Sequence, residues 1–596
     1  MILILGGTTE GRMAVRVADE AGSSYYYSTK GDLQQIVCRN GVHLTGGLDA
    51  EAMISFCRSQ EIRLLVDAAH PFAVELHNVV AETSEVLGLP VVRVERRYPE
   101  QSDDIVWCED YDDAIRLLNE DGIERVLALT GVQTIGKLRE YWQKHTCWFR
   151  ILPREESLLK AKEEGFSEQN LVYYEEGNDF ALLELLNPQA ILTKESGESG
   201  GFIQKVKAAR QYGIPVYAIK RPSLPYDSVK VTGEHGLRKQ IELHVPDFFP
   251  LRSGYTTGAC ATAASKAALL LLLGEKEPQS VPITFPNGEV LELAIAKIKK
   301  ENGGVSATVI KDAGDDPDVT DGQSIVSTIR FNDSSEIRFL QGEGVGKVTL
   351  PGLGLEIGGP AINRVPRQMI ERELSALYSG GLDVIISVPG GRELAKRTFN
   401  PRLGVEGGIS IIGTSGIVRP FSSEAYIGAI RSGIHVCKAV GSPRLVINSG
   451  AKSEGFLKAL YPELPPQAFV QYGNFIGDAL RIASELKIEK VTLGVMIGKA
   501  VKLAEGFLDT HSKNVMMNKE FLKQLAAEAG CSESAGEIIE KITLARELWT
   551  GFTLEDAELF FPLLSSRCLA VARTSFPKGQ LTLLLLDEAG KGIKAE

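Results

Sequence analysis

Two glycine- and threonine-rich turns, each running directly into a helix, most constrain how this chain can fold. The first is Gly6-Gly7-Thr8-Thr9-Glu10-Gly11-Arg12, and the second lies within Ser253-Gly254-Tyr255-Thr256-Thr257-Gly258, before an apolar helix expected over 259–273. A hydroxyl-bearing residue before a helix is typical of an N-cap, and the free N–H groups there can hold an anion. Because Pro246 and Pro250 close the preceding segment, the sequence predicts two proteins joined near residue 250.

The chain is too long for a single hydrophobic core. Its 596 residues predict about three to five domains, and 44% hydrophobic with 24% charged residues is ordinary for a globular protein. A net charge of −12 argues against a general nucleic-acid binder. The eight cysteines show no CxxC and no disulfide spacing, so we expect reduced thiols in a cytoplasmic protein. No apolar run approaches the roughly 20 residues that span a bilayer, so neither a membrane segment nor secretion is expected.

The first half has the pattern of a parallel α/β protein. An apolar strand over 1–5, the glycine turn and a helical apolar spacing over 12–21 are the opening of a dinucleotide-binding unit. The glycines stand at 6, 7 and 11, so the turn is not GxGxxG, and an ordinary glycine-rich turn explains it equally well. Thr8 and Thr9 add hydroxyls that can reach a pyrophosphate.

The next strand ends in Ser28, Thr29 and Lys30. An acidic residue is usual at this position where the ribose 2′-hydroxyl of NADH is bound. These three residues suit the 2′-phosphate of NADPH better, and a solvated turn is the alternative interpretation.

Four more strands are expected, each ending in small or polar residues before a helix, at 64–69, 126–131, 190–194 and 216–219. Parallel sheets bind ligands outside the carboxyl ends of their strands. Thr130 marks a second lobe, so we expect lobes of residues 1–129 (binding the nicotinamide cofactor) and 130–248, with a cleft between them.

Taken together, these motifs resemble the precorrin-6A reductases. The resemblance is carried, in order, by residues 6–12, Ala69-His70-Pro71-Phe72-Ala73, Thr130-Gly131, Thr193-Lys194-Glu195-Ser196-Gly197 and Arg221-Pro222. It implies reduction of one ring double bond of a corrin precursor by NADH or NADPH. The implied cofactor contacts are Gly6, Gly7, Thr8, Thr9, Gly11, Arg12, Ser28, Thr29, Lys30, Thr130 and Gly131, and the implied substrate contacts are Ser196 and Gly197.

Reduction of a tetrapyrrole rimmed with carboxylates requires a cationic cleft and a source of a proton. Lys194 and Arg12 are the candidate cations, with Lys194 as a catalytic residue. His70 is the candidate for orienting the substrate or supplying the proton after hydride transfer. A histidine before proline at a strand end is as often a hydrogen-bonded turn residue.

The second half begins with a hairpin over 280–293 around Pro286-Asn287-Gly288, followed by a strand over 305–310. The acidic stretch 311–322 lacks the spacing of a calcium loop, so a structural loop facing the active site is favoured over a metal site. Residues 407–420 are expected as a buried strand between two turns.

A strand over 384–388 leads to the most basic stretch, which contains Arg392, Lys396, Arg397 and Arg402. A polycarboxylate substrate needs bidentate partners of this kind. The alternative is a solvated surface patch. From residue 444 the pattern becomes strand and helix in alternation, with strands at 445–448, 469–471 and 491–496, which predicts a separate small parallel α/β domain.

The second half resembles the cobalt-precorrin-5B C1-methyltransferases of anaerobic cobalamin synthesis, beginning with the signature Arg252-Ser253-Gly254-Tyr255-Thr256-Thr257-Gly258-Ala259-Cys260. This implies methyl transfer from S-adenosylmethionine, although the usual glycine signature of methyltransferases is absent. Positioning of donor and acceptor supplies most of the rate in such a reaction. Candidate donor contacts are Gly413, Thr414, Ser415, Gly416 and Asn474; candidate substrate contacts are Thr256, Thr257, Arg397, Arg402 and His511, the last also as a catalytic residue.

The predicted architecture is α/β and α+β multidomain: a two-lobed Rossmann-like reductase with parallel sheets, an α+β domain over 251–435 and a parallel α/β domain over 436–596. The two implied reactions are consecutive, and linkage raises the local concentration of the cobalt-corrinoid intermediate at the second site. Reductases of the anaerobic, cobalt-containing pathway are expected to use NADH, so we favour NADH. The local residues Ser28, Thr29 and Lys30 instead indicate NADPH. The expected partners are these intermediates and other enzymes of the pathway, with no nucleic acid and no membrane. The alternative is an unrelated nicotinamide oxidoreductase fused to a non-catalytic corrinoid-binding module.

Overall fold

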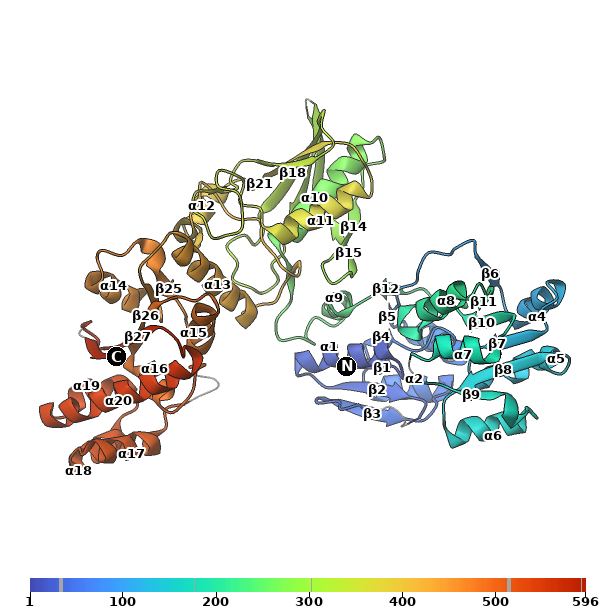
Figure 1. Cartoon of the computed structure of the whole chain (residues 1–596), viewed down its shortest axis with the longest axis horizontal. Helices are drawn as coiled ribbons and strands as arrows, with labels where there is room; N and C mark the ends of the chain where they lie inside the picture. Colours follow the sequence, from blue (N-terminus) through green and yellow to red (C-terminus); the bar gives the residue numbers. More distant parts are fainter. Residues whose placement is uncertain (32–35, 176, 302, 512–515, 591) are drawn as a thin grey trace. The chain divides into compact units, whose positions relative to one another are not determined.

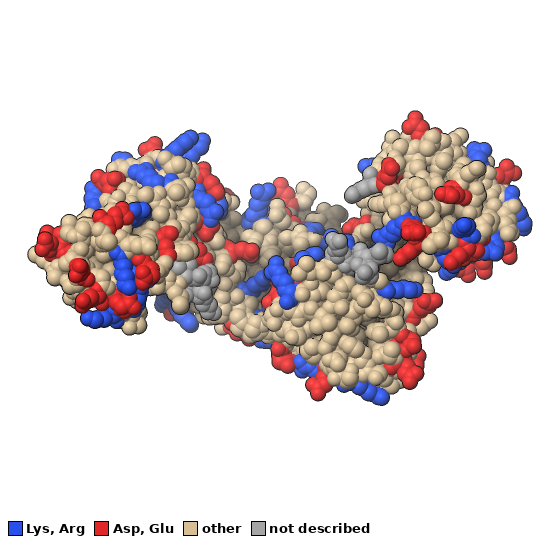
Figure 2. Space-filling view, turned by 90° about the horizontal axis from the view of Figure 1, so that it is seen from below, with Lys and Arg blue, Asp and Glu red and all other residues tan. Residues whose placement is uncertain are grey.

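A computed structural model describes residues 1–596 except 32–35, 176, 302, 512–515 and 591. The chain forms two compact units, Met1–Arg252 and Ser253–Glu596 (Figure 1). Within the described ranges, no helix is long and apolar enough to cross a membrane. On the face shown in Figure 2, Lys and Arg side chains are interspersed with Asp and Glu.

The first unit contains two six-stranded sheets, and every pairing in both is parallel, as the sequence predicts. The first sheet has the order β12 (Val229–Val231), β5 (Val91–Val94), β4 (Leu64–Asp67), β1 (Ile2–Leu5), β2 (Tyr25–Thr29) and β3 (Gly41–Thr45). The second has the order β6 (Ile105–Cys108), β11 (Val216–Ile219), β10 (Ala190–Lys194), β7 (Arg125–Ala128), β8 (Thr146–Ile151) and β9 (Leu171–Tyr173).

Helices cover both faces of the first sheet because alternate strand residues point to opposite sides. Ile2 and Ile4 of β1 pack with α1 (Thr9–Ala21) and α9 (Glu234–His244). Leu3 and Leu5 pack instead with α2 (Ala50–Ser59) and α3 (Val74–Leu87). A strand that is buried on both faces reads as the continuous apolar run seen at the start of the chain.

Each sheet has a point at which the order of its strands reverses. In the first sheet the chain builds β1, β2 and β3 outward and then places β4 on the other side of β1. In the second sheet it builds β7, β8 and β9 and then places β10 on the other side of β7. Ligands of such sheets bind outside the carboxyl ends of the strands at this reversal.

The lobes divide differently from the expected boundary at 129/130. Strand β6 already belongs to the second sheet, where it pairs with β11, and the chain returns to the first sheet at β12, which pairs with β5. Helix α9 then buries Leu237 and Ile241 in the first core, and Phe248 and Phe249 join it. The first lobe is therefore built from both ends of the unit.

The second unit starts with a buried helix on a mixed sheet. Helix α10 (Thr257–Leu272) and helix α11 (Arg364–Ser375) share one core with the sheet (Figure 1). The strand order is β16 (Lys297–Glu301), β17 (Gly304–Ile310), β18 (Ser324–Phe331), β21 (Leu382–Ser387) and β19 (Ile337–Gln341). The predicted hairpin is confirmed as β14 (Ser280–Thr284) and β15 (Val290–Ala294).

The predicted C-terminal sheet is also present. Strands β25 (Phe469–Gln471), β24 (Leu445–Asn448), β26 (Lys490–Met496) and β27 (Gln580–Leu586) are parallel, and β28 (Gly592–Ala595) is antiparallel at the edge. Helix α13 (Ser423–Ala439) packs Ile430, Ile434 and Cys437 into this core. The expected boundary after residue 435 therefore falls within a helix of the second domain.

The prediction of a strand over 407–420 is wrong. Ile409 and Ile411 make only single bridges, and β23 is two residues long (Ile417–Val418). Gly413 and Gly416 have φ of 137° and 83°, in the region that favours glycine and interrupts a strand. Ile409, Ile411 and Ile417 are buried in the core, whereas Ile412 is exposed.

Candidate functional site

The first glycine turn lies at the reversal point of the first sheet. Thr8 is the N-cap of α1: its Oγ1 accepts from the Gly11 N–H (3.1 Å) and donates to the Ala68 carbonyl (2.6 Å). The Ala68 N–H in turn donates to the Leu5 carbonyl (2.9 Å). One hydroxyl thus fastens the end of β1 to the end of β4.

The glycines of this turn make room for a tyrosine. A Cβ on Gly6 would lie 2.2 Å from Tyr27 Cε2, and one on Gly11 would lie 2.8 Å from the Tyr27 hydroxyl oxygen. The Gly7 N–H, at φ 95°, donates to the Tyr27 hydroxyl (3.0 Å). Close packing therefore explains Gly6 and Gly11 without a ligand, and their contact with a cofactor stays a prediction.

The predicted ribose-binding residues lie beside the glycine turn, because Leu5 pairs with Ser28 across β1 and β2. Ser28 and Thr29 are buried, and the Thr29 hydroxyl donates to the Gly31 carbonyl (2.7 Å). Of the three, only Lys30 is exposed. A 2′-phosphate would meet Lys30 first.

His70 follows β4 at the same reversal point. Its Nδ1 accepts from the Phe72 N–H (3.2 Å), so the ring proton lies on Nε2. Burial, together with the charges of Arg96 and Lys194, lowers the pKa of His70 to about 3. The ring is neutral near pH 7 and offers an N–H donor.

A buried charged cluster supports this loop, and sequence reasoning missed it. Asp67 is fully buried; its Oδ1 accepts from the Ala69 N–H (3.0 Å), and its Oδ2 lies 2.8 Å from Arg93 Nη1 and 3.0 Å from His77 Nδ1. Burial opposes ionisation, but hydrogen bonding with His77 and the Arg93 charge outweigh it and lower the pKa of Asp67 to about 2. The sequence signal was Arg93, a charge within an apolar strand.

The second reversal point gathers the remaining predictions for the reductase. Thr130 Oγ1 lies 2.6 Å from Thr134 Oγ1 after β7. Lys194 ends the neighbouring β10, with its ammonium 5.3 Å from the centre of the Phe72 ring. Burial and the charge of Lys137 lower the pKa of Lys194 to about 8. Among the described residues, Lys194 has no carboxylate partner within ion-pair distance.

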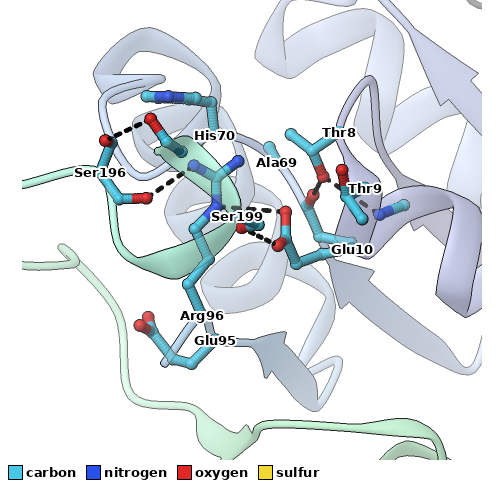
Figure 3. A network of polar contacts seen from close by, with 12 residues as sticks. Thr8, Thr9, Glu10, Ala69, His70, Glu95, Arg96, Ser196 and Ser199 are labelled. Atoms are coloured by element: carbon cyan, nitrogen blue, oxygen red, sulfur yellow. Dashed lines mark hydrogen bonds and ion pairs between the residues drawn. The ribbon is translucent and has the colours of Figure 1, made fainter. Parts of the chain in front are cut away.

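The two lobes meet at these loops (Figure 3). Arg96 Nε lies 3.1 Å from Glu10 Oε2, and Arg96 Nη1 donates to the Ser196 carbonyl (2.8 Å). The Ser199 hydroxyl donates to Glu10 Oε1. The structure thus brings the glycine turn, His70 and the 194–199 loop to one place. Arg12, predicted as a cleft cation, is exposed and donates to the Thr9 hydroxyl (3.0 Å).

In the second unit, the N–H groups and hydroxyls at the start of α10 make hydrogen bonds within the protein. Thr256 Oγ1 accepts from the Ala259 N–H (3.2 Å), and the Gly258 N–H donates to the Ile412 carbonyl (2.9 Å). Thr257 Oγ1 accepts from the Ile412 N–H (2.9 Å). Both threonines are buried and fasten the 410–416 loop to α10, and their contact with substrate stays a prediction.

That loop is the predicted donor-binding segment. A Cβ on Gly413 would lie 2.3 Å from Thr256 Oγ1, and one on Gly416 would lie 2.3 Å from Phe285 Cδ1. The Ser415 hydroxyl donates to the Ile417 carbonyl (3.0 Å). Thr414 and Ser415 are both exposed, and contact of either with the methyl donor stays a prediction.

A second group forms at the carboxyl end of β25. The Thr510 N–H donates to the Asn474 carbonyl (3.0 Å), and Lys499 Nζ donates to Asn474 Oδ1. The His511 N–H donates to Asp509 Oδ1 (3.0 Å). Asn474 and His511, far apart in the sequence, are therefore neighbours, and Lys499, with a pKa lowered by burial, is a cation that sequence reasoning missed.

The basic stretch separates into two different environments. Arg402 Nη1 lies 2.7 Å from Glu454 Oε2 and lines a small cavity of about 50 Å³ with Phe399 and Tyr426, far below the roughly 300–1,000 Å³ of a small-molecule site. Arg397 is exposed, without an ion pair among the described residues. Arg402 thus already has a partner within the protein, and Arg397 stays available.

Carboxylates of the acidic 311–322 stretch bind groups of their own loop. Asp318 Oδ2 lies 2.8 Å from the buried Lys311 ammonium, and Asp321 Oδ1 accepts from the Ala313 N–H (2.8 Å). The Asp312 carbonyl accepts from the Tyr255 N–H (2.7 Å), so the loop supports the start of the second unit.

Three family models match the chain. Residues 1–238 match precorrin-6x reductase CbiJ/CobK, residues 246–420 match CbiD, and residues 509–595 match the CbiD C-terminal domain. A cobalt-precorrin-5B C(1)-methyltransferase of Prosthecochloris aestuarii is 44% identical over 345 residues, covering 56% of this chain and 94% of the relative.

Two solved structures are also similar. A CobK precorrin-6A reductase is 23% identical and covers 41% of this chain and 97% of its own, with a TM-score of 0.35. A cobalamin biosynthesis protein (cbiD) of Archaeoglobus fulgidus is 29% identical and covers 44% and 83%, with a TM-score of 0.24. From the family models and the curated relative, the chain belongs to the precorrin-6x reductase CbiJ/CobK family through its first half and to the cobalt-precorrin-5B C(1)-methyltransferase family through its second.

Proposed function

We propose that this chain performs two consecutive steps of cobalamin biosynthesis. The second unit transfers a methyl group from S-adenosylmethionine to C1 of cobalt-precorrin-5B, and the first unit reduces the product, cobalt-precorrin-6A, to cobalt-precorrin-6B with NADH or NADPH. Membership of both families supports the pair of reactions.

One observation carries the reductase assignment: the candidate residues of both sheets meet at one place between the lobes. The glycine turn and Lys30 lie at the dinucleotide side, and Lys194 and the Ser196 loop come from the other lobe. A dinucleotide along the ends of β1 and β2 would place its nicotinamide toward Lys194. The Lys194 ammonium, which has no carboxylate partner among the described residues, suits a substrate carboxylate.

Within this site we assign the proton to Lys194 and orientation to His70. The nicotinamide supplies a hydride to one ring carbon, and a proton must then reach the other end of the reduced double bond. A group with a pKa of about 8 is a suitable acid near neutral pH, whereas a ring with a pKa of about 3 is not protonated there. His70 instead donates an Nε2–H bond to the substrate.

For the methyltransferase we place the donor between Thr414 and the Asn474–His511 group, with Arg397 on a peripheral carboxylate of the corrinoid. Transfer from a sulfonium to a carbon nucleophile needs little acid–base help, so these residues act by holding donor and acceptor in line. Lys499 contributes a positive charge and His511 contributes hydrogen bonds around the reacting atoms.

The test is incubation of the purified chain with cobalt-precorrin-5B, S-adenosylmethionine and NADH or NADPH, with mass and absorption spectra as readout. We expect one added methyl group, followed by two added hydrogens and loss of nicotinamide absorbance. Without S-adenosylmethionine neither change occurs, and Lys194→Ala stops the sequence after methylation. Corrinoid binding with no methylation would reject the enzyme in favour of a binding module.

A further inference from the structure

The contact between the two lobes contains a guanidinium that the reaction so far leaves without a role. Arg96 lies after β5, and its side chain is 6% exposed. Its Nε faces Glu10 and its Nη1 faces the Ser196 carbonyl. Its Nη2 makes no hydrogen bond to any residue that the structure describes. The Nη2 group of this buried guanidinium can therefore donate to another oxygen ligand.

The glycine-serine loop of the second lobe is shaped around this side chain. A Cβ on Gly197 would lie 2.9 Å from Arg96 Cβ, and one on Gly200 would lie 3.1 Å from Arg96 Nη1. The Glu198 N–H donates to the Arg97 carbonyl (2.9 Å). Gly197 has φ 71°, a conformation that favours glycine. The loop therefore closes over Arg96 at a fixed distance from the first lobe.

Glu10 is the acidic group on which these elements converge (Figure 3). It stands in the first turn of α1, two residues after the N-cap Thr8, where a dinucleotide fold binds pyrophosphate. One oxygen of its carboxylate accepts a hydrogen bond from the Ser199 hydroxyl, and the other accepts one from Arg96 Nε. A first-turn glutamate that only complements the helix dipole needs neither of these partners.

The carboxylate is ionised at neutral pH. Burial opposes its charge, but the Ser199 hydroxyl and the Arg96 guanidinium outweigh burial, so the pKa of Glu10 lies below its ordinary value. With its side chain 11% exposed, the ion pair is largely shielded from water. The Glu10 carboxylate thus already occupies two hydrogen-bond donors near the start of α1, the Ser199 hydroxyl and Arg96 Nε.

We propose that Arg96 and Ser199 bind the pyrophosphate of the nicotinamide dinucleotide, and that Glu10 holds both groups until the pyrophosphate replaces its carboxylate. The inference rests on the reductase function proposed above. Glu10 is then an internal competitor that keeps the lobes in register without cofactor and limits the affinity for it. Removing its charge strengthens cofactor binding, because the incoming phosphates no longer displace a partner or face a like charge.

The experiment measures dissociation constants of NADH and NADPH for the full chain by calorimetry. We expect Glu10→Gln to lower the constant of the preferred cofactor about tenfold, the scale of one charge-assisted hydrogen bond. Arg96→Lys and Ser199→Ala should raise it. Glu234→Gln is the matched control, since Glu234 forms an exposed pair with Arg16 in the same lobe. Inorganic pyrophosphate, as a second probe, should follow the same order.

The outcomes separate this inference from the proposed function. If the wild-type chain binds neither dinucleotide, the cofactor assignment and this inference both fail. If the wild type binds one and Glu10→Gln binds it equally or less well, only the inference fails, and Glu10 is a structural tie. If Arg96→Lys changes the KM for the corrinoid and leaves the dissociation constant of the dinucleotide unchanged, Arg96 belongs to the substrate subsite. That result would also overturn the inference. Glu10→Asp, which keeps the charge, provides the comparison if Glu10→Gln does not fold.

Discussion

Arg402 Nη1 lies 2.7 Å from Oε2 of Glu454, a carboxylate that is 4% exposed. Arg402 comes from the loop after the mixed sheet, and Glu454 stands on α14 (Ala451–Leu460) of the C-terminal sheet. Gln471 and Lys458 also contact Glu454 at 2.8 and 2.7 Å. The pair therefore ties the two cores of the second unit together.

Arg402→Ala should destabilise the second unit. The mutation leaves a buried carboxylate with two partners in place of three, and we expect a loss of about 1–2 kcal/mol because Arg402 itself is 41% exposed. Urea unfolding of the full chain, followed by circular dichroism, measures it. A change within about 0.5 kcal/mol, the ordinary effect of a surface substitution, would contradict the role.

Arg397→Ala should act on binding and not on stability. Loss of one charge-assisted bond to a peripheral carboxylate costs about 1.5–3 kcal/mol, so the KM for the corrin precursor should rise about ten- to hundredfold. The dissociation constant of S-adenosylmethionine should change little. Weakened binding of the donor with unchanged corrinoid binding would assign this loop to the donor.

The affinity of the reductase for its polycarboxylate substrate should fall as the pH rises through about 8. Lys194 is protonated below its pKa of about 8 and neutral above it, so it loses its attraction for a carboxylate in that range. Lys194→Arg keeps its charge and should abolish this dependence. Steady-state KM measured against pH for both proteins decides it.

The same pKa predicts the sign of a stability change. In the unfolded chain Lys194 titrates near its ordinary value of about 10.4, so between about pH 8 and 10 the unfolded state binds more protons. This residue therefore contributes a rise in unfolding free energy with pH across that window. Denaturant titrations at several pH values should show that the unfolding free energy rises more steeply with pH in the wild type than in Lys194→Met across this window.

The two units should fold as separate fragments, 1–252 and 253–596, each with one activity. A fragment ending at residue 245 should be unstable, because Phe248 and Phe249 are buried in the first core. Thermal melts and activity assays of the three fragments test this. Insolubility of fragment 1–252 or of fragment 253–596 would show that the units depend on each other.

Lys30→Ala should discriminate between the cofactors. Lys30 is the exposed residue of the strand end, so its loss should reduce kcat/KM for NADPH and leave that for NADH unchanged. Equal effects on both cofactors would place Lys30 elsewhere than at the 2′ position.

Elements with strong local signals could be predicted from the sequence. Local patterns predicted the apolar strand β1, the glycine turn and the helix that follows it. The Pro286-Asn287-Gly288 turn likewise predicted the hairpin. Lys194 and His70 were found because polar residues after buried strands point to the carboxyl edge of a parallel sheet.

What the sequence did not reveal depends on contacts between distant segments. Thr256 and Thr257 read as ligand contacts, yet their hydroxyl groups bond within α10 and to Ile412, more than 150 positions away from Thr257. Arg96 and Glu10 contact Ser196 and Ser199 of the second lobe, and no local sequence pattern indicates that these segments lie together. The 407–420 loop has the composition of a strand, and only the conformations of its glycines show otherwise.

The return of the chain to its first sheet decides which part of the reductase carries the fusion. Because β12, α9 and the phenylalanines that follow belong to the first lobe, the methyltransferase is attached to the lobe that holds the glycine turn. The second lobe is joined to the first by two passes of the chain, from β5 to β6 and from β11 to β12, and the methyltransferase is not attached to it. A movement of the second lobe about these two connections would therefore leave the attachment point of the methyltransferase in place.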